Sequence, residues 1–363
     1  MIKDIDSQQW NTLLNSDYPF LQHQFLAALE NSGSVSEQTG WQPAHCTVEK
    51  DGALLAAAPC YIKEHSWGEY VFDQQWANAY QQSGMAYYPK LICSIPFTPS
   101  TGPRLLGDPL ALAAKLQQQC EQDSLSGVHL LFLPEHDATT LEAAGWHLRN
   151  DVQFHWNNRQ YESFDNFLAE LSSSKRKKIK RERRRIEEQN VRFSALGAND
   201  IDDQLWETIY RFYSNTYQVR GQQPYLNREF FNLVRQSMAN NLVVLLAHHE
   251  ERPVACAICF RDGDTLYGRH WGAEASYHSL HFETCYYQGI EYCIANQLSH
   301  FDAGAQGQHK VSRGFTPITT FSAHWLADPK FNDAIGRFVS QETPGVAEYA
   351  ENVASHSPYK ESG

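Results

Sequence analysis

The sequence lacks the features that mark secreted, membrane-spanning or metal-binding chains. Its longest apolar runs, such as Leu242 to Ala247, are far shorter than the roughly 20 residues that span a bilayer. Eight cysteines are scattered without the spacing of a disulfide framework or a zinc site. Residues Met1 to Asn11 do not have the basic and then apolar order of a signal peptide. We therefore expect a cytoplasmic protein with reduced cysteines, no metal and no membrane span.

Two common nucleotide-binding motifs are also missing, because the chain contains neither a GxGxxG nor a Walker sequence. What it does contain is ample material for folded cores. Of its 363 residues, 42% are hydrophobic and 13% are aromatic, which argues against disorder. This length fits two ordinary domains better than one.

Charge is unevenly distributed along the chain. The net charge is −12, yet residues 175–185 hold nine Lys or Arg and one Glu. Apolar residues at Leu168, Leu171, Ile179 and Ile186 form a narrow seam, which predicts a helix through this segment. Most charge runs are solvated helix faces, but such a cluster in an acidic protein favours contact with a phosphate-rich partner. We expect Lys177, Arg181 and Arg184 to contribute, with transfer RNA, a nucleotide-linked acceptor, coenzyme A or an acyl carrier protein as partner.

The two halves of the chain show the same order of predicted elements, namely helices, a hairpin, a helix, a strand and a closing strand. In the first half these are 7–14, 20–30, 41–62, 109–122, 128–133 and 152–157, with a short helix at 138–144 and an aromatic loop at 63–104. In the second half they are 201–217, 228–240, 242–260, 265–271, 282–298, 300–302 and 319–325.

The closing segments of the two halves even match in sequence. Gly145-Trp146 precedes His155-Trp156 by the same offset with which Gly314-Phe315 precedes His324-Trp325. This match favours an internal duplication. The order of elements predicts an α+β fold rather than an alternating βαβ fold. We expect an N-terminal domain at 1–157, a basic helical connector at 158–190 and a C-terminal domain at 191–363.

Four motifs carry a resemblance to a known family. They are Lys63-Glu64-His65-Ser66-Trp67-Gly68-Glu69-Tyr70, Tyr87-Tyr88-Pro89-Lys90, Leu280-His281-Phe282-Glu283, and the stretch from Gly304 to Phe315. The chain resembles a bacterial family of predicted N-acyltransferases labelled peptidoglycan biosynthesis/recognition, and the Fem-type tandem GNAT transferases. This resemblance implies two GNAT-like domains, each a mixed, mainly antiparallel sheet flanked by helices, with the C-terminal domain catalytic and the N-terminal domain on the acceptor side.

The sequence departs from the GNAT pattern in the segment that would bind the acyl donor. GNAT enzymes hold the coenzyme A pyrophosphate on a glycine-containing loop before the long helix. The corresponding segment here, Glu274 to His281, contains no glycine, so close approach of the backbone to a pyrophosphate is harder. This disfavours conventional acetyl-CoA binding. The co-substrate that we expect is an acyl-CoA, an acyl carrier protein or an aminoacyl-tRNA. No tightly bound cofactor is expected.

Candidate chemistry gathers between residues 269 and 313. Acyl transfer to an amine needs a base for the amine and positive charge near the carbonyl oxygen. The candidate acid/base residues are Glu283, His309 and His270, and the candidate donor-binding residues are Lys310, Arg313, Gln306 and Arg269. Each of these residues also has a purely structural interpretation. Arg269 and His270 could form the polar end of a strand, and Glu283 could stabilise the helix dipole.

In the first half, candidates for acceptor recognition are Lys63, His65, Glu69, Tyr87, Tyr88 and Lys90. An ordered aromatic loop that closes the domain interface is an equally good interpretation of these residues. For the whole chain we expect an N-acyltransferase that moves an acyl or aminoacyl group to an amine acceptor, such as a cell-wall precursor or a peptide. The alternative is a non-catalytic GNAT-like module that recognises peptidoglycan fragments or a protein partner.

Overall fold

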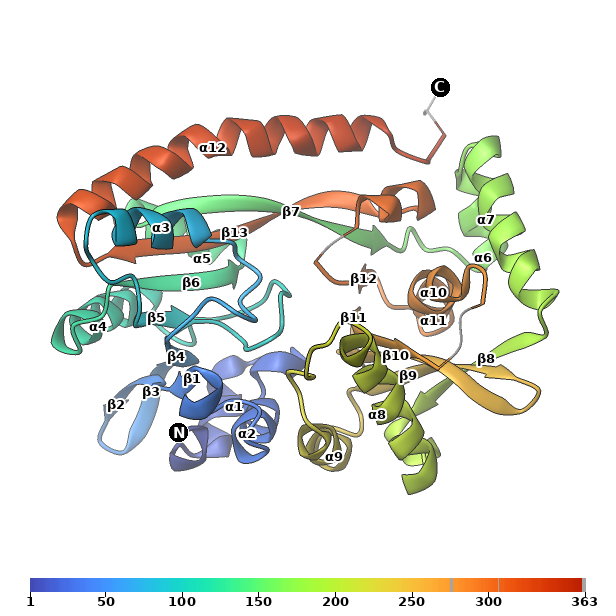
Figure 1. The fold of residues 1–363 in the computed structure, drawn as a ribbon, viewed down its shortest axis with the longest axis horizontal. Helices are drawn as coiled ribbons and strands as arrows, with labels where there is room; N and C mark the ends of the chain where they lie inside the picture. Colours follow the sequence, from blue (N-terminus) through green and yellow to red (C-terminus); the bar gives the residue numbers. More distant parts are fainter. Residues whose placement is uncertain (275–276, 306, 361–363) are drawn as a thin grey trace. The chain divides into compact units, whose positions relative to one another are not determined.

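The structure is a computed structural model that describes residues 1–274, 277–305 and 307–360 (Figure 1). Contacts between residues divide the chain into two compact units. Unit 1 comprises Met1–Val152 and Thr319–Tyr349, and unit 2 comprises Gln153–Ile318 and Ala350–Gly363. None of the described helices is both long and apolar enough to cross a bilayer.

Unit 1 contains a mainly antiparallel sheet. Its strands, in spatial order, are β1 (Trp41–Pro43), β4 (Cys60–Lys63), β5 (Lys90–Cys93), β6 (Gly127–Leu133), β13 (Thr316–Leu326) and β7 (His147–Asn157). A separate hairpin joins β2 (Cys46–Lys50) to β3 (Ala53–Ala58). Strands β5 and β6 pair in parallel, whereas β1 with β4, β4 with β5, and β6 with β13 pair antiparallel.

The helices of unit 1 cover the apolar strands. They are α1 (Ser7–Leu14), α2 (His23–Asn31), α3 (Gln74–Gln82), α4 (Pro109–Gln122), α5 (Glu135–Ala143) and most of α12 (Pro329–Ser355). Helix α4 begins where the Asp108 side chain accepts hydrogen bonds from Leu110 N and Ala111 N. Its buried Leu112 and Leu116 join the core against β6, every residue of which is buried.

Unit 2 has a second, mainly antiparallel sheet. Beside the end of β7 lie β12 (His300–Asp302), β11 (Thr265–Ala273), β10 (Arg252–Arg261), β9 (Leu242–His249) and β8 (Val191–Gly197). Strands β11 and β12 run in parallel, whereas β12 with β7, β11 with β10, β10 with β9, and β9 with β8 pair antiparallel. Its helices are α6 (Phe164–Glu170), α7 (Ser173–Glu187), α8 (Asp203–Gln218), α9 (Arg228–Ser237), α10 (Leu280–Phe282), the π-helical η5 (Glu283–Tyr287), α11 (Gln288–Ala295) and the 3₁₀ helix η6 (Gln308–Arg313).

The predicted α+β class is confirmed, and the same order of elements recurs in the two units. In each unit a helix connects two parallel strands, β5 to β6 through α4 and β11 to β12 through α10–α11. The strands that follow, β7 and β13, have 11 residues each and begin two residues after Gly145 and Gly314. The matching dipeptides therefore mark equivalent places in the fold.

The boundaries of the two units differ from the linear division at 1–157, 158–190 and 191–363. Residues Thr319–Tyr349 belong to unit 1, because β13 pairs antiparallel with β6 from Phe321↔Leu133 to Leu326↔Gly127. The basic connector belongs to unit 2. Strand β7 begins in unit 1 and ends in unit 2, while β13 does the reverse.

Several elements occur where none was predicted. Helix α3 and strand β5 lie inside the expected aromatic loop, β8 precedes the first helix predicted for the second half, and α12 follows the last predicted strand. Helix α12 contains Pro344 and Gly345, which weaken a helical pattern in the sequence. In unit 1 it is held by packing against α3, where the rings of Tyr80 and Phe331 stack with centroids 3.8 Å apart.

Candidate functional site

The candidate site lies in unit 2, where the two parallel strands diverge. Strands β11 and β12 pair only over three residues, ending at Tyr267↔Asp302. Beyond this point β11 continues to Ala273, while the chain after β12 turns away through Gly304 and Gly307 into η6. Both glycines have φ in the left-handed region, 88° and 117°, which other residues rarely adopt.

Lys310 is buried at this divergence and its ammonium group donates to the carbonyl oxygen of Gly304. Burial lowers the pKa of Lys310 to about 8, against the opposing attraction of Asp302. Arg269 on β11 lowers this pKa further, so the predicted donor-binding residues Arg269 and Lys310 do lie in one electrostatic field. A lysine in this state carries positive charge at neutral pH and loses it just above.

His309 is exposed at the start of η6 and is held by a tyrosine. Its Nε2 lies 2.9 Å from the hydroxyl oxygen of Tyr286 on η5. Partial burial and the neighbouring Arg313 and Lys310 lower the pKa of His309 below its ordinary value of 6.5. Gly307 makes room for the ring, because a Cβ there would lie 2.6 Å from Cε1 of His309. His309 is therefore neutral at pH 7 and able to accept a proton.

Aromatic side chains surround this histidine. His309 contacts the rings of Phe282 and Tyr286, with centroids 5.6 and 5.7 Å away. His281 contacts Tyr286 edge-on, and burial lowers its pKa to about 4, so that it also stays neutral. The π-helical turn that carries Tyr286 is a feature that recurs at functional sites.

Two of the predicted site residues are instead occupied in buried ion pairs with α7. Arg313 donates from Nη2 to both carboxylate oxygens of Glu182, at 2.8 and 3.1 Å, and its guanidinium carbon lies 3.6 Å from the centre of the Phe282 ring. Glu283 accepts from Nε of Arg183 at 3.1 Å and from Gln288 at 2.8 Å. The geometry therefore favours Glu283 as an anchor for α7 over its predicted role as a base.

His270 lies apart from the group around His309. Its ring packs between Tyr213 and Phe231 from α8 and α9, on the face of β11 opposite to its two neighbours in the strand. Trp271, the next residue, contacts His281 instead. Burial, with a smaller effect of Arg269, lowers the pKa of His270 to about 3. Gln306 lies outside the described residues.

The predicted basic helix exists as α7, and its apolar seam is buried at Ile179 and Ile186. Lys177, Arg181 and Arg184, the expected partner-binding residues, are all exposed. They recur at intervals of four and three residues, which places them on one face of the helix. Arg184 has a local partner in Glu188, at 3.4 Å.

The predicted acceptor residues of unit 1 form a buried network. Lys90 donates to Glu69 at 2.8 Å and to Asp73, and it also contacts Ser66 at 2.9 Å. Tyr87 donates to Asp73 at 2.7 Å. Four of the predicted acceptor residues are buried, namely Lys63, Glu69, Tyr87 and Lys90. The other two, His65 and Tyr88, are half-buried.

Lys63 lies in the same region but is stabilised differently. Its ammonium sits 3.7 Å from the centre of the Trp41 ring and donates to the carbonyl oxygen of Trp67 at 3.3 Å. Burial lowers the pKa of Lys63 to about 7 and raises that of Glu69 to about 7. These residues hold the 64–73 loop, and such an ordered loop is the second interpretation that the sequence allowed.

A pair of histidines extends this network into the core of unit 1. Nδ1 of His129 lies 2.8 Å from Nδ1 of His324, and Nε2 of His324 lies 2.8 Å from Ser322 Oγ. His129 also approaches the Tyr87 hydroxyl at 3.4 Å. Burial lowers the pKa of both histidines well below 6.5.

Two residues of the unit 2 site had no clear signal in the sequence. Asp302 and His155 face each other across the β12–β7 pairing, with Nε2 of His155 3.6 Å from an Asp302 carboxylate oxygen. Burial lowers the pKa of His155 while Asp302 opposes this. The two residues are far apart in the sequence, so no local pattern indicates that they interact. The register of the paired strands places them opposite each other.

The comparison with protein families assigns the chain to a class. The sequence matches the FemAB-like family, described as peptidoglycan biosynthesis/recognition, over residues 1–361. The chain therefore belongs to this family, as the motifs indicated. No curated protein matches the sequence.

Solved structures share the fold at low sequence identity. FemX is 10% identical with a TM-score of 0.56, covering 92% of this chain and 98% of its own. L-PGS from Bacillus licheniformis is 11% identical with a TM-score of 0.52, covering 89% and 98%. A tandem GNAT protein from the clavulanic acid pathway is 9% identical, with a TM-score of 0.47 and coverages of 90% and 96%.

Proposed function

We propose that this protein is a transferase that moves an acyl or aminoacyl group from an activated donor to an amine, with the transfer site in unit 2. The observation that carries this proposal is the pairing of a neutral, accessible His309 with a buried cationic Lys310 at the divergence of β11 and β12. Membership of a peptidoglycan biosynthesis/recognition family and the fold shared with FemX and L-PGS support it.

His309 would act as the general base. In the tautomer whose Nε2–H donates to the Tyr286 hydroxyl oxygen, Nδ1 keeps a lone pair that can take the proton of the attacking amine. The C–N bond then forms, the bond from carbonyl carbon to the donor's ester oxygen or thioester sulfur breaks, and the proton passes to the leaving group. Lys310 and Arg269 would supply positive potential for the charge that develops on the carbonyl oxygen.

The substrates follow from the chemistry and the family. An amine on a cell-wall precursor or a peptide would be the acceptor. An aminoacyl-tRNA, an acyl carrier protein or an acyl-CoA would be the donor, and the exposed basic face of α7 suits any of these anionic molecules.

A first experiment is a thermal-shift screen of the full chain against acyl-CoAs, an acyl carrier protein and charged tRNA. A donor that binds the folded protein raises its melting temperature by mass action. Turnover with that donor should then fall about 100-fold or more in His309→Gln and in Lys310→Met. His136→Gln, at an exposed histidine of α5 in unit 1, is the matched control and should leave turnover unchanged. Unchanged turnover in both site variants would refute the site.

A non-catalytic binding module is the second candidate. It is favoured by the fact that Arg313 and Glu283 are already satisfied by Glu182 and Arg183. On this alternative, binding of a peptidoglycan fragment would occur without any donor being consumed, and substitution of His309 would change affinity but no rate.

A further inference from the structure

The face of α7 that packs against η6 carries two lysines outside the group of residues assigned to the transfer site. Glu182 on this face accepts two hydrogen bonds from Nη2 of Arg313, at 2.8 and 3.1 Å. Lys178 lies one helical turn before Glu182 and Lys175 lies two turns before it, so the three side chains share one face of the helix. Lys175 and Lys178 are half-exposed, whereas Glu182 is buried.

This arrangement brings Lys178 close to His309. Arg313 connects the two elements, because it binds Glu182 and also donates from Nη1 to the carbonyl oxygen of His309 at 2.8 Å. Lys178 lies about 6 Å along the α-helix from Glu182. His309 lies about 8 Å along the 3₁₀ helix from Arg313. Burial lowers the pKa of His309 most, two cations of η6 come next, and Lys178 lowers it further. The ammonium of Lys178 therefore acts directly on this ring.

Positive charge is in excess on this face of α7. Burial lowers the pKa of Lys178, and Arg313 lowers it further against the attraction of Glu182. Lys175 and Arg181 also repel the Lys178 ammonium. Within the described parts of the chain, neither Lys175 nor Lys178 forms an ion pair. The one nearby carboxylate, that of Glu182, already pairs with Arg313. An anion bound between the lysines would thus relieve repulsion without breaking an existing pair.

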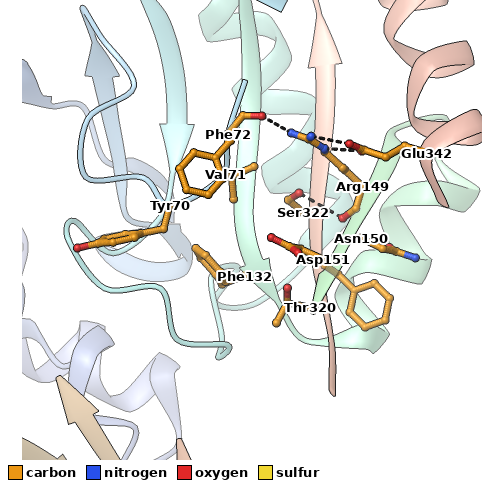
Figure 2. Close-up of a pocket in the computed structure, with 11 residues that line it drawn as sticks. Tyr70, Val71, Phe72, Phe132, Arg149, Asn150, Asp151, Thr320, Ser322 and Glu342 are labelled. Carbon is orange, nitrogen blue, oxygen red and sulfur yellow. Dashed lines mark hydrogen bonds and ion pairs between the residues drawn. The ribbon is translucent and has the colours of Figure 1, made fainter. Parts of the chain in front are cut away.

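The cavity of about 70 Å³ in unit 1 provides a contrast, because its cation is already neutralised (Figure 2). Arg149 donates from Nε and Nη2 to the two carboxylate oxygens of Glu342, at 2.7 and 2.8 Å, and from Nη1 to the Phe72 carbonyl oxygen at 2.6 Å (Figure 2). Asp151 adds a further carboxylate to the lining. An anion there would have to break a bidentate ion pair.

We propose that Lys175 and Lys178 form a binding site for a phosphate group of the donor, directly beside His309. A lysine ammonium is a compact charge with three N–H donors, and it suits phosphate oxygens. Phosphate is also what the proposed donors share, since coenzyme A, the arm of an acyl carrier protein and RNA all carry it. The inference deepens the proposed transfer and rests on it for the identity of the ligand.

Occupation of this site would adjust the proposed base. Lys178 and Arg313 disfavour the protonated form of His309, and a bound phosphate would cancel part of their field. The other titratable groups that face the ring are uncharged at neutral pH, because burial lowers the pKa of His281 and raises that of Tyr286. A general base works best with a pKa near the operating pH. Donor binding would therefore strengthen the base when the donor is in place.

The test follows the His309 ring by NMR in the full chain as pH is varied, with and without inorganic phosphate at constant ionic strength. Phosphate should raise the pKa of His309. In Lys178→Met this pKa should be higher even without phosphate, and phosphate should bind about tenfold more weakly. Lys178→Arg keeps the charge and should retain binding. Lys180→Met, at an exposed lysine of the same helix whose partner is Asp165 at 3.2 Å, is the control and should bind phosphate like the unaltered protein.

Two results would overturn the inference. One is a pKa of His309 that does not respond to phosphate in the unaltered protein, and the other is unchanged phosphate binding in Lys178→Met. Inorganic diphosphate and a dinucleotide, tested in the same way, distinguish the sources of the phosphate. Tighter binding of diphosphate supports a site for coenzyme A, and tighter binding of the dinucleotide supports a site for a phosphodiester. No turnover is measured, so failure here leaves the proposed transferase standing, and unchanged turnover in His309→Gln leaves the phosphate site standing.

Discussion

At the scale of single residues, the two central groups of the candidate site are tuned in complementary ways. Burial keeps His309 neutral at pH 7 by lowering its pKa, and it brings the pKa of Lys310 down to about 8. A working site needs the histidine unprotonated and the lysine protonated. These conditions overlap only between the two pKa values, so the active fraction of the protein depends on pH from both sides.

The turnover of the transferase should therefore follow a bell-shaped pH profile. Its acid limb should lie below pH 6.5, where His309 gains a proton, and its alkaline limb near pH 8, where Lys310 loses one. In Lys310→Arg the alkaline limb should move well above pH 8, because a guanidinium stays charged. An alkaline limb that does not move in this variant would show that another group causes it. Steady-state rates between pH 5 and 10 provide the measurement.

The buried pair of His129 and His324 makes unit 1 sensitive to acid. Their pKa values in the folded state are lowered well below 6.5, so below that pH the unfolded chain binds protons that the folded chain excludes. Stability should be fully present above pH 6.5 and fall by about 1.4 kcal/mol per pH unit for each histidine.

This expectation can be checked by chemical denaturation at pH 7.5, 5.5 and 4.5. The double variant His129→Gln/His324→Gln should have a shallower loss between pH 6.5 and 4.5, even if it is less stable at pH 7.5. An equally steep loss in the double variant would place the acid sensitivity in other groups, with the buried His270 as the next candidate.

At the scale of elements, α7 has two different faces. One is fixed to η5 by the ion pair of Arg183 with Glu283, and to η6 by the ion pair of Glu182 with Arg313. The other presents Lys177, Arg181 and Arg184 to solvent. The run of charges in the sequence therefore contains both structural and partner-binding positions, and only burial separates them.

The docked face predicts a stability effect. Arg183→Met leaves the buried Glu283 carboxylate without its cation and should lower the free energy of unfolding by about 3 kcal/mol. Adding Glu283→Gln should recover part of that loss, because no buried charge is then left unpaired. The single variant Glu283→Gln should retain turnover at temperatures where it is folded. A complete loss of turnover in that folded variant would restore Glu283 as the base.

The exposed face predicts a salt-dependent interaction. Lys177→Gln/Arg181→Gln/Arg184→Gln should change the free energy of unfolding by less than about 0.5 kcal/mol. It should lower affinity for an RNA probe and reduce the slope of log K against log salt by roughly two to three. Affinity can be measured by fluorescence anisotropy at salt concentrations between about 50 and 300 mM. An affinity that does not depend on salt in the unaltered protein would exclude this surface as a polyanion site.

At the scale of the whole molecule, unit 1 is completed by a segment from late in the chain. Most of β13 and most of α12, Thr319–Tyr349, belong to unit 1, although Gln153–Ile318 of unit 2 precede them in the sequence. They supply Leu326, Ile335 and Val339 to a cluster that contains Trp76 and Tyr80. A chain cut at residue 157 therefore lacks part of the unit 1 core.

We expect the fragment 1–157 to remain unfolded or aggregate when it is expressed alone. Without β13, the paired edge of β6 is exposed, and Trp76 and Tyr80 lose their apolar partners. A dispersed two-dimensional NMR spectrum of this fragment would contradict this expectation and show that the N-terminal half folds independently. The full chain under the same conditions is the control.

Local signals were enough to predict much of the fold. Helix α4 has Asp108 as its cap, Pro109 at its first position and apolar residues at helical spacing, so its bounds could be read directly from the sequence. Strand β6 is a short run that is apolar apart from His129, and it was predicted just as clearly. By contrast, α12 interrupts its own pattern with Pro344 and Gly345 and depends on packing against α3.

The candidate site was predictable only in part, for a similar reason. The glycine-rich segment around Gly304 and Gly307 pointed to His309 and Lys310, because glycines at positive φ and nearby basic residues are local features. The role of Glu283 could not be read in this way, since its partner Arg183 lies 100 residues earlier. The Asp302–His155 pair is hidden for the same reason.

The sequence by itself determined the family, the α+β class, the duplicated order of elements and the basic helix, because motifs, periodicity and composition are properties of neighbouring residues. The tertiary structure decided which strands complete which unit, which charges of α7 are buried, and how the cavity beside Arg149 is lined. Pairing register and burial depend on residues far apart in the chain, and it is these that set the pKa values on which the proposed chemistry rests.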